Sequence, residues 1–154
     1  MTKLAAPLII AAHAAKLPTL TPWQPTGNRA AVVIAEGPVS RRDDVPEWLS
    51  LGYVSNADAA TSFEAVSDAQ GSTRDAGSIT SQLVVAAADV PTARARTFEL
   101  LEAWQQWLHT DRTLAGAVTQ FDGHLLADVA FDTTRGGGRA ITTVSVSYRA
   151  ITYG

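Results

Sequence analysis

The clearest pattern in the chain is an alternation of apolar and polar residues over its last third. Between Arg139 and Thr152 one face carries Ala140, Thr142, Val144, Val146, Tyr148 and Ala150. Because successive residues of a strand point to opposite sides, this period of two predicts a half-buried strand. Fourteen residues at about 3.3 Å each would reach about 46 Å, so the strand either bends midway or projects from the domain. A projecting part would be free to contact a neighbouring subunit.

Shorter apolar runs predict further strands. We expect them at residues 30–36, 48–54, 61–66, 78–88, 115–121 and 124–132. The first of these is expected to be buried on both faces, and Gly52 favours a bulge in the second. Within the fourth, one face carries Ile79, Ser81, Leu83, Val85 and Ala87. Asp122-Gly123 predicts a two-residue hairpin turn.

Two segments have the period of an α-helix. The first runs from a cap at Thr2 to about Leu17, with an expected buried stripe of Leu4, Leu8, Ala11, Ala12 and Ala15. The second spans about Pro91 to His109, and Asp89 suits its positively polarised N-terminus. Its apolar stripe is Ala93, Thr97, Leu100, Leu101, Trp104, Trp107 and Leu108. Arg96 is expected on the exposed face.

Three segments are predicted to be loops. Pro22, Pro25 and Gly27 argue against regular structure in residues 19–28. Residues 67–77 are polar and glycine-containing, and we expect them to be exposed and flexible. Residues 133–138 predict a glycine-rich hairpin tip.

The order of helix, strands, helix and strands predicts one α+β domain over residues 1–154. We expect a mainly antiparallel or mixed β-sheet with two helices packed on one face. The chain has 154 residues, of which 46% are hydrophobic and 18% charged, so it can bury a core without metal ions or disulfides. It contains no cysteine, which excludes disulfides and thiolate chemistry. The N-terminal apolar run is far shorter than the ~20 residues of a membrane span, and no membrane partner is expected.

The sequence lacks the motifs of familiar catalytic sites. His13, His109 and His124 have no spacing typical of a metal site. There is no Gly-x-Ser-x-Gly or Ser-x-x-Lys motif, and Gly136-Gly137-Gly138 is not followed by the Lys-Ser/Thr of a phosphate loop. We therefore expect no catalytic residue, cofactor or metal ion. A net charge of −3 also gives no attraction to nucleic acid.

Several segments together resemble one protein family. They are Ile79 to Val85 in the place of a central strand, Ala93 to Trp104 in the place of a helix, Leu108 to Val118 as a turn into a strand, and, more loosely, Trp48 to Val54. In this order they resemble the tail terminator (tail completion) proteins of long-tailed bacteriophages, especially those infecting actinobacteria. The likeness covers residues 77–151 well and the first half loosely. Ala115 departs from the family's turn pattern, Asp-x-Thr-Leu-Gly-Gly-x-Val, at its first glycine.

The resemblance implies a structural role in the virion. Such proteins form a ring, typically hexameric, on the head-proximal end of the tail tube. The ring stops tube growth and joins the major tail tube protein to the head-completion (connector) protein. DNA passes through its lumen without specific binding, and no cofactor is involved.

The exposed and glycine-rich segments are the candidate subunit or partner interface. The residues are Arg41, Arg42, Trp48, Arg135, Gly136, Gly137, Gly138 and Arg139. If they serve assembly, deleting residues 136–138 or substituting the flanking arginines should disturb assembly more than folding. Two alternatives stay open. One is a head-completion or connector (neck) protein, and the other is a small-molecule-binding α+β domain with its cleft between sheet and helices.

Overall fold

The computed structural model describes residues 4–37, 45–54, 60–68, 70–134 and 137–153. Within these residues the chain forms two α-helices, two short 3₁₀-helices and six strands. In chain order these are α1 (Ala5–Lys16), η1 (Leu17–Thr19), η2 (Thr21–Trp23), β1 (Val33–Glu36), β2 (Glu47–Leu51), β3 (Thr61–Ser67), β4 (Ser72–Ala87), α2 (Val90–Thr110), β5 (Gln120–Thr134) and β6 (Gly137–Tyr153). The predicted α+β class, a mixed sheet with helices packed against it, is confirmed.

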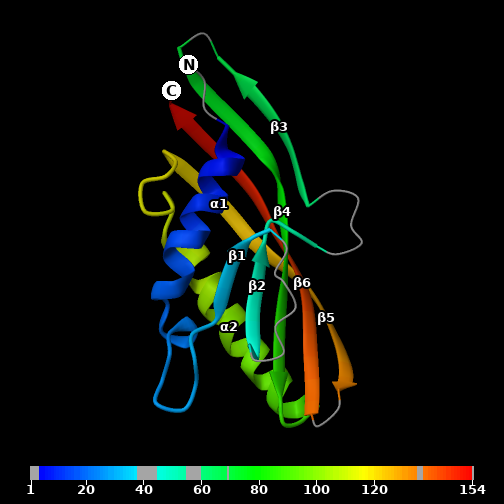
Figure 1. The fold of residues 1–154 in the computed structure, drawn as a ribbon. Helices are drawn as coiled ribbons and strands as arrows, with labels where there is room; N and C mark the ends of the chain where they lie inside the picture. The colour runs from blue at the N-terminus through cyan, green and yellow to red at the C-terminus, as the bar shows by residue number, and fades with distance from the viewer. Residues whose placement is uncertain (1–3, 38–44, 55–59, 69, 135–136, 154) are drawn as a thin grey trace.

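The six strands form one sheet, in which five follow the order β1-β2-β4-β6-β5 and β3 pairs with β4. The edge of β4 that faces away from β6 is shared, because β2 pairs with residues 82–85 and β3 with residues 73–79. Only the β1–β2 pair is parallel. Strands β4, β6 and β5 have 16, 17 and 15 residues, and Figure 1 shows them side by side along the length of the molecule.

Strand β6 lies inside the sheet. It pairs with β4 from Ser72 to Ala87 and with β5 from Gln120 to Thr134. The alternation of its residues is confirmed, since its even-numbered residues from Gly138 to Thr152 are all buried. Its length is therefore matched by two equally long neighbours, and the expectation that part of it projects from the domain is wrong. The free edges belong to other strands.

Helix α2 packs against the middle of the sheet. The Asp89 carboxylate accepts a hydrogen bond from Thr92 N at 2.8 Å, which caps the helix. All seven residues of the predicted stripe are buried. Arg96 is buried as well, so its expected exposure is wrong. The helix touches β4, β5 and β6, and burying a Leu or Trp side chain there stabilises the fold by about 1.5–3 kcal/mol.

Helix α1 covers the same face of the sheet, but the residues that it buries there are not the expected stripe. The buried residues are Ala5, Ala6, Ile9 and His13, whereas Leu4 and Ala15 are exposed. At the helix start the buried carboxylate of Asp75 accepts a hydrogen bond from Ala5 N. This carboxylate, supplied by β4, ties the start of α1 to the sheet. The start of α1 and the end of β6 consequently lie at the same end of the molecule (Figure 1).

Aromatic rings fill the space between the helices and the sheet. Trp23 and Trp104 meet edge to face with ring centroids 5.9 Å apart. The His13 ring lies 5.6 Å from Trp104 and 4.8 Å from Trp107. Phe121 stacks on Tyr148 at the sheet. The opposite face of the sheet carries no helix among the described residues and is called the helix-free face below.

The segment after α2 differs from the prediction. Residues 115–119 form turns, and β5 begins only at Gln120. Leu114, Ala115 and Gly116 all have positive φ, at 49°, 58° and 84°, which a strand does not allow. Asp111 holds this turn through hydrogen bonds from Thr113 N and Ala115 N.

Asp122 and Gly123 lie inside β5, opposite Arg149 and Tyr148, so the predicted hairpin turn at this point is wrong. Glycine is needed at this position because a Cβ on Gly123 would meet the Phe121 ring at 2.5 Å. The β5–β6 hairpin instead closes beyond Thr134, which pairs with Gly137.

Four further expectations also change. Ser72, Thr73 and Asp75 are buried in β4, so residues 72–77 of the predicted exposed loop are strand, whereas Asp68 and Gln70 are exposed as expected. Strand β1 lies at the edge of the sheet with Val33 exposed, although its apolar run suggested burial on both faces. β2 ends at Leu51, and Gly52 turns the chain with φ 68°. The segment 19–28 contains part of two 3₁₀-helices.

Candidate assembly surfaces

The predicted interface residues at the hairpin tip belong largely to the fold. A Cβ on Gly138 would come 2.3 Å from Val90 N, and one on Gly137 would come 2.3 Å from Ala87 O. These two glycines therefore let the start of β6 pack against the β4–α2 junction. Arg135 and Gly136 lie outside the described residues.

Arg139 is engaged across the hairpin. Its Nη2 and Nε donate to the two Asp132 carboxylate oxygens at 2.6 and 3.1 Å, and this pairing lowers the pKa of Asp132. The same hydrogen bonds raise the pKa of Arg139. The arginine is thus a cross-strand partner on the helix-free face rather than a free cation at a tip.

Trp48 also serves the monomer. It lies half-buried in β2, directly opposite Val84 of β4 and Val33 of β1. This register places it on the helix-free face, where Val84 is nearly completely covered. The structure therefore brings Trp48 and Arg139 onto one face but at separate strands. Arg41 and Arg42 lie outside the described residues.

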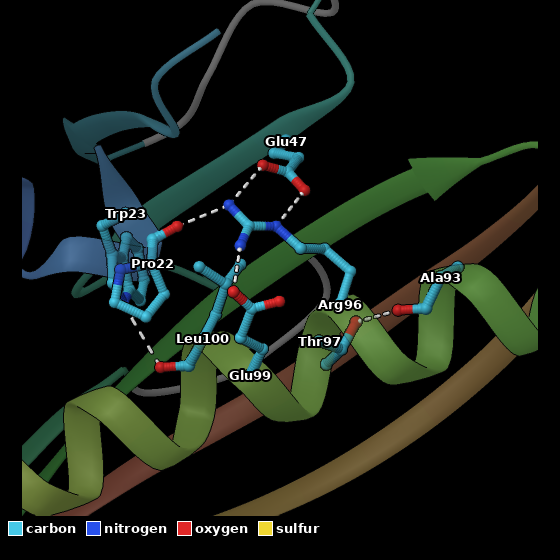
Figure 2. Close-up of polar contacts among 8 residues, drawn as sticks. All are labelled: Pro22, Trp23, Glu47, Ala93, Arg96, Thr97, Glu99 and Leu100. Carbon is cyan, nitrogen blue, oxygen red and sulfur yellow. Dashed lines mark hydrogen bonds and ion pairs between the residues drawn. The ribbon is translucent and has the colours of Figure 1, made fainter. Parts of the chain in front are cut away.

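A buried ion pair that was not predicted connects α2 to β2 (Figure 2). Arg96 Nε and Nη2 donate to the Glu47 carboxylate at 2.7 and 3.0 Å, and Nη2 also donates to Pro22 O at 2.6 Å. Nη1 lies 3.3 Å from the Glu99 carboxylate. The Trp23 indole N–H donates to Leu100 O at 3.2 Å beside this cluster. One residue thus joins the helix, the sheet and η2.

The sequence holds one signal for this pair. Arg96 stands three residues after Ala93 and four before Leu100, which places it inside the apolar stripe of the helix. A bidentate arginine–carboxylate pair is the form in which such a charge is buried. The pair connects the helix to the sheet.

The apolar side chains that remain exposed concentrate near the edges of the sheet. The large ones are Leu4, Val33, Phe63, Val66, Phe98, Leu126, Phe131 and Tyr153. Leu126 and Phe131 belong to the edge strand β5, and Phe63 and Val66 belong to β3. Phe131 lies under the guanidinium of Arg94, with 5.1 Å from the Arg94 Cζ to the ring centroid. Apolar residues at unpaired strand edges are typical of surfaces that meet another chain.

The helix-free face is concave between β3 and β5. A hollow of about 640 Å³ is lined by small residues of the middle strands, among them Ala76 and Ser78, and by the longer side chains of Glu64, Asp122 and His124. Asp122 is paired with Arg112 at 3.2 Å. The wall of this hollow is polar and of mixed charge. The hollow lies on the helix-free face, whereas the cleft expected from the sequence would lie between the sheet and the helices, where aromatic rings fill the space.

Two buried groups have shifted pKa values. Burial lowers the pKa of His13 to about 4, although its Nδ1 contacts Ile9 O at 2.8 Å. Burial and the nearby Asp75 raise the pKa of Tyr148 to about 12. Within the described ranges, no group of three His, Asp or Glu residues could hold a metal ion.

Comparison with known proteins leaves the family open. No protein-family model matches the chain, and no curated protein matches it. Among the residues that the structure describes, no helix is long and apolar enough to cross a membrane.

Proposed function

We propose that this chain is a tail terminator of a long-tailed bacteriophage, a virion structural protein that forms a ring on the head-proximal end of the tail tube. The observation that carries the proposal is the open sheet. Its two edges, β5 on one side and β1 with β3 on the other, are different surfaces. Contacts between two different surfaces of one chain are head-to-tail, and they close into a ring when the rotation closes.

The order of elements supports the same role. Strand β4, helix α2 and the turn that leads into β5 follow one another, in the order of the segments on which the resemblance rests. The partners are other copies of the chain, with six the number that the resemblance favours, the major tail tube protein and the head-completion protein. DNA would pass through the lumen, and a chain with net charge −3 would not retain it.

The proposal is tested by locating the protein in virions. Antibody labelling should mark the junction between the tail tube and the head, at the tube end. Labelling on the portal side of that junction would instead favour the connector role. Absence of the protein from virions would contradict both roles.

A further inference from the structure

The edge of the sheet at β5 is open over about half of its length. Odd-numbered residues of β5 direct their backbone groups away from β6. Phe121 N donates to Arg112 O at 2.6 Å, and Leu125 N donates to Gln105 Oε1 at 3.0 Å. These contacts cover the edge up to Leu125. Beyond it, the outward N–H groups of Ala127, Val129 and Phe131 have no partner within the part of the chain that the structure describes.

Helix α2 forms a wall along this open edge. The groove between them has a volume of about 540 Å³ and is lined by Phe98, Leu101, Glu102, Gln105, Gln106, Leu125 and Ala127. Phe98 and Phe131 are 46% and 39% exposed. An unpaired edge beside a helix can accept an extended segment, which adds as a further strand and places alternate side chains in the groove.

Strand β3 offers a matching edge on the other side of the sheet. Ala60 O accepts from Thr80 N, and Asp68 N donates to Ser72 O, so the even-numbered residues of β3 face β4. Thr61, Phe63, Ala65 and Ser67 therefore direct their backbone groups outward. Phe63 and Val66 are 45% and 62% exposed. β3 contains no Lys or Pro, the residues that most often protect edge strands from pairing, and its one charged residue is Glu64.

We propose that β3 of a second copy of this chain adds antiparallel to β5 in the α2–β5 groove. This inference rests on the proposed ring and names its subunit contact. β3 runs antiparallel to β4, and two antiparallel steps through β6 make β5 run in the direction of β4. β3 and β5 are therefore antiparallel, and a rotation about an axis along the strands keeps them so.

The outward-bonding residues of both edge strands also have their side chains on the same side of the sheet. Phe121 and Leu125 of β5 pair with Ala150 and Val146, which are buried on the helix side of the sheet. The odd-numbered residues of β3 lie on that side too, because Thr61 pairs with the buried Ile79. In an antiparallel hydrogen-bonded pair both side chains point to the same side. The joined sheet consequently keeps the helices of both subunits on one side.

Charge selects one register. When Phe63 stands opposite Phe131, Ala65 meets Val129 and Ser67 meets Ala127, so the open groups of both edges are used. Val66 of one copy then stands opposite Asp128 of the other copy. Arg74 pairs with Val66 on the neighbouring strand β4, so Arg74 is the next residue across the joined sheet. Arg74 and Asp128 are exposed, and neither forms an ion pair within the described ranges.

Two strand spacings of about 4.8 Å separate Arg74 and Asp128 in this register, a distance that the two side chains span together. A slip by two residues would place Glu64 opposite Asp128, which like charges disfavour. The charges therefore complement one another in only the first of these two registers.

The size of the contact favours a closed ring over a dimer. A short strand-to-strand contact buries less than the ~1,600 Å² of a standard interface. In a ring each subunit makes the contact twice, whereas a dimer leaves one edge of each kind open.

Cysteine cross-linking tests the contact, since the chain has no cysteine of its own. The variant Glu64→Cys/Ala130→Cys changes two exposed residues that face each other in a non-hydrogen-bonded pair. Their Cα atoms would be about 4.5 Å apart, within the ~4.4–6.8 Å range of disulfides. Mild oxidation at high protein concentration should give a ladder of linked multimers that ends at the ring size. The matched control Glu64→Cys/Leu126→Cys moves one cysteine about 13 Å along the strand and should stay unlinked.

The outcomes separate the contact from the ring. Oligomers that form but do not link through positions 64 and 130 would refute this contact and leave the proposed function standing. A monomer at every concentration, with no linkage, would refute both. A synthetic peptide of residues 60–68 should reduce linkage at least tenfold when in excess. Equal competition by a scrambled peptide would show that the groove binds strands in general and overturn the choice of occupant.

Discussion

Arg96 shows how one residue fixes the arrangement of three elements. Its guanidinium is buried and bidentate on Glu47, and it also reaches Pro22 O. Such a pair adds little net stability relative to apolar residues. Each partner, however, offsets the cost of burying the charge of the other. The pair therefore specifies where α2 lies on the sheet.

The change Arg96→Met should lower the free energy of unfolding by about 3–5 kcal/mol, because the Glu47 carboxylate is left buried without its partner. The double change Arg96→Met/Glu47→Met should cost less than Arg96→Met alone. Urea unfolding of the three proteins measures both effects. A loss below about 1 kcal/mol for Arg96→Met would contradict the compensated pair.

His13 gives the molecule a pH dependence that can be assigned to one side chain. Burial lowers its pKa from 6.5 to about 4. Between these values the unfolded chain binds the proton and the folded chain does not, so stability rises with pH from about 4 to 6.5. At the acid end of this window the free energy of unfolding is lower by about 3 kcal/mol than at its upper end.

The variant His13→Leu should lack this contribution, so its stability should change less between pH 4.5 and pH 7 than that of the wild type. Urea midpoints at the two pH values measure the difference. Equal pH dependence in both proteins would show that His13 is not the group responsible.

At the scale of elements, the junction of β4, α2 and β6 depends on close backbone approach. A Cβ at Gly138 would meet Val90 N at 2.3 Å and Asp89 C at 2.5 Å. Both are backbone atoms at the capped start of α2, which have little freedom to move. The glycine-rich sequence there is explained by packing within one subunit.

Gly138→Ala should therefore lower stability by about 1–3 kcal/mol through overpacking. Gly27→Ala is the matched control, because a Cβ there meets nothing within 4 Å, and it should stay within about 0.5 kcal/mol of the wild type. Thermal unfolding compares the two. A neutral Gly138→Ala would return this segment to the candidates for assembly.

Elements with a strong local period were predictable from the sequence, and non-local pairing was not. The stripe of α2 and the alternation of β6 follow from 3.6- and two-residue periods that burial obeys. Asp122-Gly123 has the composition of a turn, but pairing with Arg149 and Tyr148 overrides that local preference. Asp75 looked like a loop residue because its partner, Ala5 N, is 70 residues away.

The candidate interface was harder to predict for the same reason. Charge and composition favour Arg139 and Gly138 as interface residues, yet a strand partner and the start of α2 account for both. An edge strand is recognised only when strand order is known, since β5 and β6 have similar lengths and both carry apolar residues. Phe63 and Val66 drew no attention because their exposure depends on how β3 pairs.

At the scale of the whole molecule, the fold is a sheet that helices cover on one face and whose edge strands have unpaired backbone groups. The two helices and the aromatic core cover one face, and the helix-free face is concave and polar. Growth is therefore possible in the plane of the sheet, from the β5 edge to the β3 edge. On this geometry we base the proposal that a monomer of 16.3 kDa assembles into a ring around a lumen.

The most direct test of head-to-tail assembly is the mass of the purified protein over a range of concentrations, by native mass spectrometry or sedimentation. We expect monomer at low concentration and one closed species at high concentration, with six times the mass of the chain as the value that the resemblance favours. A chain that stays monomeric at every concentration, or that grows without limit, would contradict the account.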